Sequence, residues 1–193
     1  RMSINPDVAL TLSRTERDLD ADALNLIAQE PVLLKQAKIP TAVTPHLGEM
    51  ARLTGKSISA LKENLPAAAA DFAESFHTVC VLKDARTVVA SPEGAVFINS
   101  SGCSALATAG SGDVLAGILA SLLVQQKNSG SPRPMEQTAA AAVFLHGLLG
   151  EQAARQKGEA SVLAGDLIRT LASGCFSQQS IPPEKIGNTL LRS

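Results

Sequence analysis

One stretch of the sequence combines residue types that phosphoryl chemistry needs. Gly110-Ser111-Gly112 runs directly into Asp113, and an apolar, helix-forming segment follows from Val114 to Val124. Glycines ahead of a helix leave its first backbone N–H groups free, and these groups attract an anion together with the helix dipole. A carboxylate at the same place would repel a bound phosphate. We therefore expect Asp113 to act on a proton beside the anion, as a general base.

The same stretch also has a purely structural interpretation. Ser111 or Asp113 would then cap the helix by accepting hydrogen bonds from its first amides. The stretch is neither a Walker A loop, because no Gly-Lys-Ser/Thr follows, nor a Gly-x-Gly-x-x-Gly dinucleotide motif. The glycines alone leave both interpretations open, so the neighbouring segments have to decide between them.

A second candidate stretch, from Thr44 to Glu49, follows the short apolar pair Ala42-Val43. A helical pattern starts at about Met50, so this stretch is predicted to join a strand to a helix. Open α/β sheets bind ligands at such junctions, at the carboxyl ends of their strands. His46 and Glu49 are therefore candidates for a ligand site. The alternatives are a structural histidine and a glutamate that complements the helix dipole.

A third candidate is Lys83, which ends the continuous apolar run from Thr78 to Leu82. Such a run is typical of a strand buried on both faces. A charged turn follows to Thr87, and residues 88–90 and 95–98 flank Ser-Pro-Glu-Gly as a predicted β-hairpin. Lys83 at the end of a buried strand is placed either to reach a phosphate or to be solvated.

Helices are expected around these strands. Helical spacing is present in residues 57–73, with a second helix beginning at Pro66, and in residues 113–126, 135–156 and 163–172. His146 is expected in or beside the core. The last helix is expected to be capped by Gly165 or Ser161, and the polar residues 13–18 to form a loop.

Composition limits the classes of function. The chain of 193 residues is long enough for one domain with a core, and its 17 basic and 18 acidic residues nearly cancel. We therefore expect no nucleic-acid partner and no membrane partner. Trp and Tyr are absent, which argues against the stacking of nucleic-acid bases on aromatic side chains. The three cysteines are far apart, which favours a reduced, cytoplasmic setting without a metal cluster. The longest apolar run is too short to span a membrane.

Four stretches in this order resemble one family. They are residues 19–25 (Leu-Asp-Ala-Asp-Ala-Leu-Asn), 44–53 (Thr-Pro-His-Leu-Gly-Glu-Met-Ala-Arg-Leu), 81–83 (Val-Leu-Lys) and 110–117 (Gly-Ser-Gly-Asp-Val-Leu-Ala-Gly). The sequence is similar to the ADP-dependent NAD(P)H-hydrate dehydratases of the ribokinase-like superfamily, over about residues 19–172. The resemblance implies a three-layer α/β/α fold with the active site at the carboxyl ends of the strands. We expect that domain over residues 19–176, after a poorly defined segment 1–18 and before a tail at 177–193.

The resemblance also implies a reaction and its residues. A phosphoryl group would pass from ADP, or from ATP as in eukaryotic relatives, to the hydroxyl of hydrated NADH or NADPH, and loss of phosphate would regenerate the dinucleotide. Asp113 would take the hydroxyl proton and contact the substrate with His46, and Glu49 would reach Mg²⁺ through water. The positions implied to bind the nucleotide are Lys83, Asp84, Ala85, Arg86, Thr87, Gly110, Ser111 and Gly112. A homo-oligomer, a tetramer in the family, is implied as well.

The sequence departs from the family pattern in several places. Leu47 stands where the family usually has Pro, Asp84 where it has Gly, and Cys103 where it has Asn. The resemblance implies that the N-terminal half of the family's domain, with its glycine-rich substrate contacts, has no counterpart in these 193 residues. Two other functions remain open at this stage. One is a small-molecule kinase of the same superfamily, acting on a sugar, hydroxyethylthiazole or pyridoxal; the other is a nucleotide-binding module without chemistry.

Overall fold

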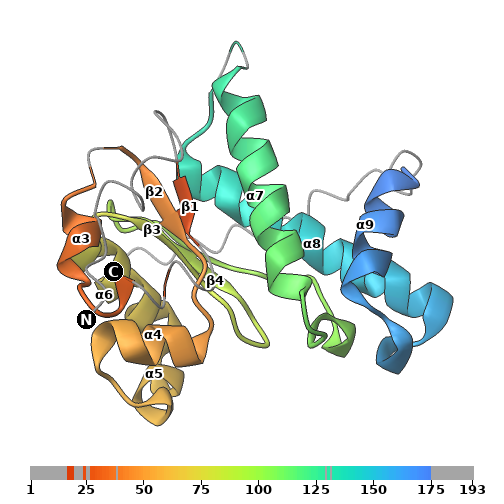
Figure 1. Cartoon of the computed structure of the whole chain (residues 1–193), viewed down its shortest axis with the longest axis horizontal. Coiled ribbons are helices and arrows are strands. Elements are labelled where there is room, and N and C mark those ends of the chain that lie inside the picture. Colours follow the sequence, from red (N-terminus) through yellow and green to blue (C-terminus); the bar gives the residue numbers. More distant parts are fainter. Residues whose placement is uncertain are drawn as a thin grey trace.

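The structure is a computed structural model, and it describes residues 17–19, 24, 27–37, 39–128, 130 and 132–174. Within these residues the strands form a single mixed sheet, in which neighbours in sequence are neighbours in space (Figure 1). The strands are β1 (Arg17–Leu19), β2 (Thr41–Val43), β3 (Val79–Leu82), β4 (Val88–Ala90) and β5 (Val96–Ile98).

The direction of the strands decides where a site can form. β1, β2 and β3 pair in parallel, whereas β4 and β5 form the predicted antiparallel hairpin. The chain reverses direction twice after β3, so β5 again runs parallel to β3. The carboxyl ends of β1, β2, β3 and β5 therefore share one edge of the sheet, the edge at which ligands bind in open α/β sheets.

Alternate residues of the strands face opposite sides of the sheet, because side chains in a strand alternate. Val79 and Val81 of β3 belong to one buried cluster, whereas Cys80 and Leu82 belong to another. All four side chains are buried, which explains why the sequence reads as a continuous apolar run. Burial also raises the pKa of the Cys80 thiol, so this thiol stays protonated.

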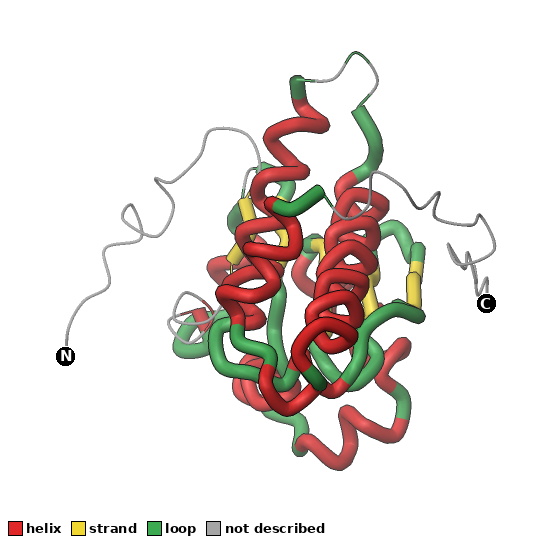
Figure 2. The backbone as a smooth tube through the Cα atoms, turned by 90° about the vertical axis from the view of Figure 1, so that its right-hand side faces the viewer, coloured by secondary structure: helices red, strands yellow, loops and turns green. Residues whose placement is uncertain are grey.

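Helices cover both faces of the sheet, which confirms the expected three-layer α/β/α architecture (Figure 1). One layer holds α3 (Val32–Lys35), α4 (Leu47–Thr54), α5 (Ile58–Glu63) and α6 (Leu65–Phe76). The other holds α7 (Ser111–Lys127), α8 (Met135–Lys157) and α9 (Ala164–Ala172), with the short 3₁₀ turns η1 (Ser104–Leu106) and η2 (Glu159–Ser161). Figure 2 shows long helices of this second layer side by side in front of the strands.

Most predicted elements are confirmed, and two predictions are wrong. Arg17 and Asp18 lie in β1 and not in a loop, because pairing with β2 satisfies their backbone whatever the local polarity. Neither Gly165 nor Ser161 caps α9: the carboxylate of Asp166 accepts the Leu163 N–H at 3.0 Å instead. The segment 177–193 lies outside the described residues. In the described part of the chain, no helix has the length and apolarity that a membrane crossing requires.

The loop between β5 and α7 is held in place by α8. The Ser101 hydroxyl donates to the carbonyl of Phe144 at 2.9 Å, and the Gly102 N–H donates to Glu151 Oε1 at 2.8 Å. This close approach depends on a glycine of α8: a Cβ atom on Gly147 would lie 2.0 Å from Ser101 Oγ and 2.7 Å from its carbonyl carbon. The α8 helix thus sets the path by which the chain reaches α7.

We expect Gly147→Ala to destabilise the protein by about 1–3 kcal/mol, because the added methyl group must displace the backbone of the loop. Gly117→Ala on α7 is the matched control. A Cβ atom there meets nothing within 4 Å, so its helix propensity should stabilise the protein by up to about 1 kcal/mol. Denaturant unfolding of both variants measures the difference. Equal effects of the two substitutions would contradict this account of the loop.

Candidate active site

Two of the predicted stretches meet at the carboxyl edge of the sheet. The chain leaving β2 runs beside the chain leaving β3: the Lys83 N–H donates to the carbonyl of Pro45 at 2.8 Å, and His46 and Lys83 form a parallel bridge. On the other side, the Asn99 N–H donates to the carbonyl of Thr87 at 2.9 Å, where β5 ends. Residues far apart in the sequence are therefore adjacent here.

His46 and Glu49 form a capping box at the start of α4. His46 Nδ1 accepts the N–H groups of Gly48 at 2.9 Å and Glu49 at 3.2 Å, and Glu49 Oε2 accepts the His46 N–H at 2.7 Å. The His46 side chain remains 54% exposed, whereas that of Glu49 is 5% exposed. His46 therefore combines a structural role with an exposed ring at the edge of the site.

The carboxylate of Glu49 has little capacity left for a metal ion. Its side chain is buried and engaged with His46, so a direct bond to Mg²⁺ does not fit this geometry. Across the described ranges, no group of three or more His, Cys, Asp or Glu side chains is arranged to hold a metal. The water-mediated magnesium contact of Glu49 stays a prediction. Protein Mg²⁺ sites commonly use one or two carboxylates with waters and the substrate's phosphates, so no such cluster is required.

The turn after β3 lies beside this capping box. Lys83, Asp84 and Thr87 are half-buried, whereas Ala85 and Arg86 are exposed. The turn therefore offers backbone and side-chain groups at the surface of the carboxyl edge. Its predicted role in binding the nucleotide stays a prediction.

The start of α7 has the geometry expected of an anion site. Gly110 adopts φ 81°, a left-handed conformation that suits glycine, and no side chain caps the helix. The N–H groups of Gly112 and Asp113 donate to no group among the described residues. Asp113 is exposed, and its Oδ2 lies 3.9 Å from the position of a Cβ atom on Gly110. Capping by Ser111 or Asp113 is therefore the wrong alternative.

Ser111 instead faces the protein interior, where it hydrogen-bonds with His146. Ser111 Oγ lies 3.1 Å from His146 Nε2, and both residues are buried. Burial lowers the pKa of His146; the positive charge of Lys83 adds to this effect, and the backbone of Ser111 opposes it. The sequence analysis placed His146 only near the core and missed this pair, because nothing in the spacing of the two residues links α7 to α8.

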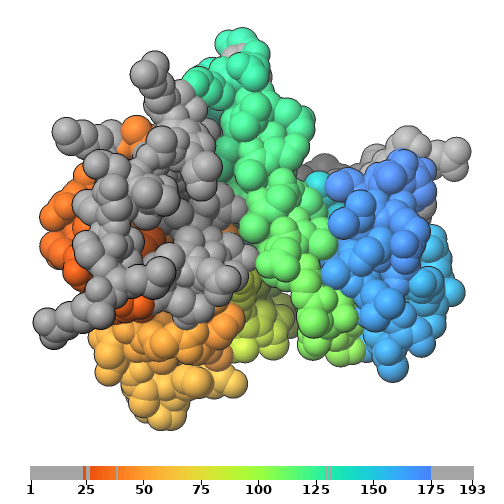
Figure 3. Space-filling model, viewed as in Figure 1, coloured from red at the N-terminus to blue at the C-terminus, as the bar shows by residue number. Residues whose placement is uncertain are grey.

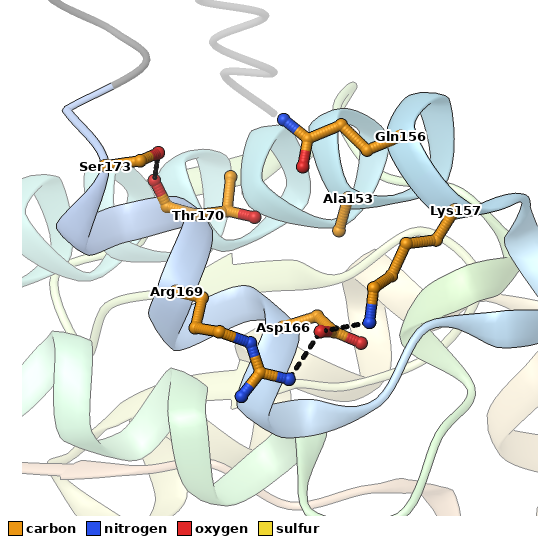
Figure 4. Close-up of a pocket in the computed structure, with 7 residues that line it drawn as sticks. All are labelled: Ala153, Gln156, Lys157, Asp166, Arg169, Thr170 and Ser173. Atoms are coloured by element: carbon orange, nitrogen blue, oxygen red, sulfur yellow. Dashed lines mark hydrogen bonds and ion pairs between the residues drawn. The ribbon is translucent and has the colours of Figure 1, made fainter.

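The start of α9 closes the other side of Gly110. A Cβ atom on Gly110 would lie 3.2 Å from the Cβ of Ala164, the first residue of α9. Asp166 fixes this helix: Lys157 and Arg169 each place a nitrogen 2.6 Å from its Oδ1, as Figure 4 shows. The bond to Lys157, the Leu163 N–H and Arg169 together hold the pKa of the Asp166 carboxyl far below its usual range. Figure 3 shows α9 (blue) at the right-hand end of the molecule.

A family model described as NAD(P)H-hydrate dehydratase matches residues 15–173 of the chain. The chain belongs to this family. The match spans the capping box, the turn after β3 and the start of α7, so all the predicted site residues lie within it.

Curated relatives of this dehydratase family are longer than the chain. A bifunctional NAD(P)H-hydrate repair enzyme of Moorella thermoacetica is 45% identical over 150 residues, which cover 78% of the chain and 27% of that protein. An ADP-dependent (S)-NAD(P)H-hydrate dehydratase of Neisseria meningitidis is 38% identical over 152 residues, which cover 77% of the chain and 49% of that protein. The chain thus spans about a quarter to a half of the length of these relatives.

Solved structures share the fold of this dehydratase-family chain. The Bacillus subtilis ADP/ATP-dependent NAD(P)H-hydrate dehydratase, co-crystallised with ATP and Mg²⁺, matches with a TM-score of 0.67 and 29% identity, covering 82% of the chain and 55% of that protein. A ribokinase-like superfamily protein of Enterococcus faecalis matches with a TM-score of 0.67 and 30% identity, covering 81% and 50%. The fold is therefore ribokinase-like, as the sequence predicted.

Because His146 is buried, we expect the free energy of unfolding of the protein to decrease in mild acid. Its pKa lies below the ordinary value of 6.5 in the folded state, so the unfolded chain binds a proton first as the pH falls. This contribution to stability is complete above pH 6.5 and is lost below it, by up to about 1.4 kcal/mol per pH unit until the folded pKa is reached. Denaturant unfolding at pH 7.5 and pH 5.5 measures it.

The matched variants are His146→Gln, which removes the titrating group, and His77→Asn, which replaces an exposed histidine at a left-handed position that Asn tolerates. We expect a smaller acid-induced loss for His146→Gln than for the wild type, and the wild-type loss for His77→Asn. An unchanged pH dependence in His146→Gln would refute the assignment.

Proposed function

We propose that this protein converts hydrated NADH or NADPH back to the dinucleotide, in a reaction driven by ADP or ATP. The observation that carries the proposal is the start of α7, where an exposed carboxylate, Asp113, stands beside the amides of Gly112 and Asp113, which donate to no group in the described part of the chain. The Neisseria relative is described as ADP-dependent and the Bacillus relative as ADP/ATP-dependent. Either nucleotide is therefore a suitable co-substrate to test.

In the first step, Asp113 accepts the proton of the hydrate hydroxyl while the hydroxyl oxygen attacks the terminal phosphoryl group of the nucleotide. The bond between that phosphorus and the bridging oxygen breaks, leaving AMP from ADP or ADP from ATP. The helix dipole and the N–H groups of Gly112 and Asp113 stabilise the charge that develops on the phosphoryl oxygens. In the second step, the phosphate ester leaves as inorganic phosphate, a neighbouring carbon loses a proton, and the ring double bond of NADH or NADPH forms.

The remaining site residues would hold the two substrates in line. His46 presents an exposed ring at the carboxyl edge, where it would contact the dinucleotide hydrate. Lys83 and the turn to Thr87, together with Gly110 and Gly112 at the start of α7, would hold the nucleotide phosphates. Ser111 would not contact the phosphates, because its hydroxyl bonds with His146 and its N–H donates to the carbonyl of Thr108. Positioning and charge neutralisation are the main demands of phosphoryl transfer, and these groups supply both.

Magnesium would enter the site chiefly with the nucleotide, since it binds phosphate oxygens and keeps several waters. When bound, it would neutralise charge on the phosphates. Of the residues here, only Glu49 was predicted to reach it, and only through water. The tetramer implied by the family resemblance also stays a prediction.

The principal alternative is a kinase that stops after phosphoryl transfer. Such an enzyme would use the same base and the same helix start, so the geometry of α7 does not separate the two functions. Incubation of the protein with hydrated NADH, Mg²⁺ and ADP or ATP distinguishes them. Recovery of reduced-nicotinamide absorbance supports the dehydratase, whereas no recovery together with phosphorylation of a sugar or a vitamin alcohol supports the kinase.

Asp113→Asn tests the proposed base. The amide keeps the size of the side chain but cannot accept the proton, so we expect kcat to fall about 10²–10⁴-fold. Affinity for the nucleotide should be retained or increased, because a negative charge beside the phosphates is removed. Steady-state kinetics and calorimetric titration with ADP measure the two effects. Turnover at the wild-type rate would rule Asp113 out as the base.

His46→Asn separates the two roles of His46. Asn is a favoured N-cap residue, so the start of α4 and the stability of the protein should be largely maintained. Loss of the exposed ring should raise KM for the hydrate while KM for the nucleotide stays unchanged. His46→Ala, which also removes the cap, should in addition lower stability by about 1 kcal/mol. If KM for the hydrate is unchanged in both variants, His46 does not contact the hydrate and its role is limited to capping α4.

A further inference from the structure

We infer that His146 is a positioning residue for phosphoryl transfer: by holding Ser111 Oγ, it orients the first turn of α7 so that the amides of Gly112 and Asp113 face the nucleotide. This inference rests on the function proposed above. It assigns to α8 a role that the sequence pattern did not reveal.

The contact is placed where it controls the site. Ser111 is the first residue of α7 and directly precedes the two amides that form the anion site. Its hydroxyl lies 3.1 Å from His146 Nε2, and the two residues are 4% and 7% exposed. A rotation of Ser111 away from His146 would turn the following peptide groups with it, since they belong to the same helical turn.

The α8 helix forms hydrogen bonds with the chain on both sides of Gly110. Upstream, it holds Ser101 through the carbonyl of Phe144 and Gly102 through Glu151. Downstream, it holds Ser111 through His146. Gly110 itself, in its left-handed conformation, lies between these attachments. The attachments fix the bend before α7 and the direction of its first turn.

The pair does not act as a nucleophile and its base. A serine beside a histidine after a glycine is an arrangement also found in covalent catalysis. Here, however, Ser111 is buried, so its oxygen is not presented to a substrate. Burial, with a further contribution from the positive charge of Lys83, lowers the pKa of His146 and so disfavours the charged imidazolium that a general base would become. A neutral, buried imidazole bonded to a buried hydroxyl is suited to holding a geometry.

The opposing explanation is that the two groups merely satisfy each other in the interior. It predicts that their removal lowers stability and leaves the kinetics of the folded protein unchanged. A matched control for this effect is available at the opposite edge of the sheet, where the buried Thr78 hydroxyl donates to the carbonyl of Thr41 at 2.6 Å. Thr78→Val removes a buried hydrogen bond remote from α7.

The experiment compares Ser111→Ala, His146→Leu, their double variant, His146→Gln and Thr78→Val in the protein. For each, we measure the unfolding midpoint, kcat and KM with hydrated NADH, and the calorimetric Kd for ADP. We expect Ser111→Ala and His146→Leu each to lower kcat about 10–100-fold, with a smaller rise in KM for ADP, because misplacement of a preorganised site costs rate above all. The double variant should be no worse than either single variant, since both break one contact.

Two further results distinguish positioning from packing. His146→Gln keeps an amide that can bond Ser111, so it should recover most of kcat, whereas Thr78→Val should lose stability and keep wild-type kinetics. Wild-type kinetics in Ser111→Ala and His146→Leu, or effects that multiply in the double variant, would overturn the inference. If the wild type binds ADP but does not dehydrate the hydrate, the proposed function is wrong and the inference can still be tested through ADP binding. Weaker ADP binding in His146→Leu and in Ser111→Ala, with no further loss in the double variant, would then support the inference, and unchanged or additive effects would overturn it.

Discussion

The structure depends on a helix start that no side chain caps. A polar side chain at the N-cap commonly accepts a hydrogen bond from the first amides of a helix, and His46, Ser57 and Asn64 cap α4, α5 and α6 in this way. At α7 the corresponding position is Gly110, and Ser111 is directed inward to His146. The first amides that capping side chains satisfy at α4, α5 and α6 have no such cap at α7, and the exposed Asp113 stands beside them.

The layers of the fold maintain this arrangement. The sheet is buried between two helical layers, and its carboxyl edge collects the ends of β2, β3 and β5. The α8 helix packs on the sheet and holds the loop that leads to α7, while Asp166 fixes the start of α9 against Gly110. Backbone groups can remain unpaired at one place because packed elements fix their surroundings on every side.

Local patterns predicted much of this fold, for physical reasons that can be stated. The buried strand β3, the hairpin and the helices α7 and α8 follow from apolar runs, turn residues and helical spacing, which act within a few residues. The choice of the junction at His46 as a candidate site followed from the rule that open α/β sheets bind ligands at the carboxyl ends of their strands. Of the two interpretations of the glycine stretch, the structure removes the capping one, and the anion site stays a prediction.

What the sequence did not reveal depends on contacts between distant residues. The strand at Arg17 and Asp18 forms because β2 offers it backbone partners, which local polarity does not show. The pair of Ser111 and His146 joins residues 35 positions apart, and the cap of α9 comes from Asp166 with two cations around it. The sequence analysis assigned Glu49 a possible interaction with the helix dipole, but it did not predict the hydrogen bond that the carboxylate accepts from the His46 N–H.

The hairpin of β4 and β5 has a practical consequence. Its turn, from Ser91 to Ala95, closes with the Ser91 N–H donating to the carbonyl of Ala95 at 2.9 Å, and Gly94 takes φ 90° there. The two reversals of the chain place this turn at the amino ends of the parallel strands, away from the carboxyl edge. A fluorophore or an epitope inserted between Pro92 and Gly94 would therefore report on the molecule from the edge of the sheet opposite the candidate site.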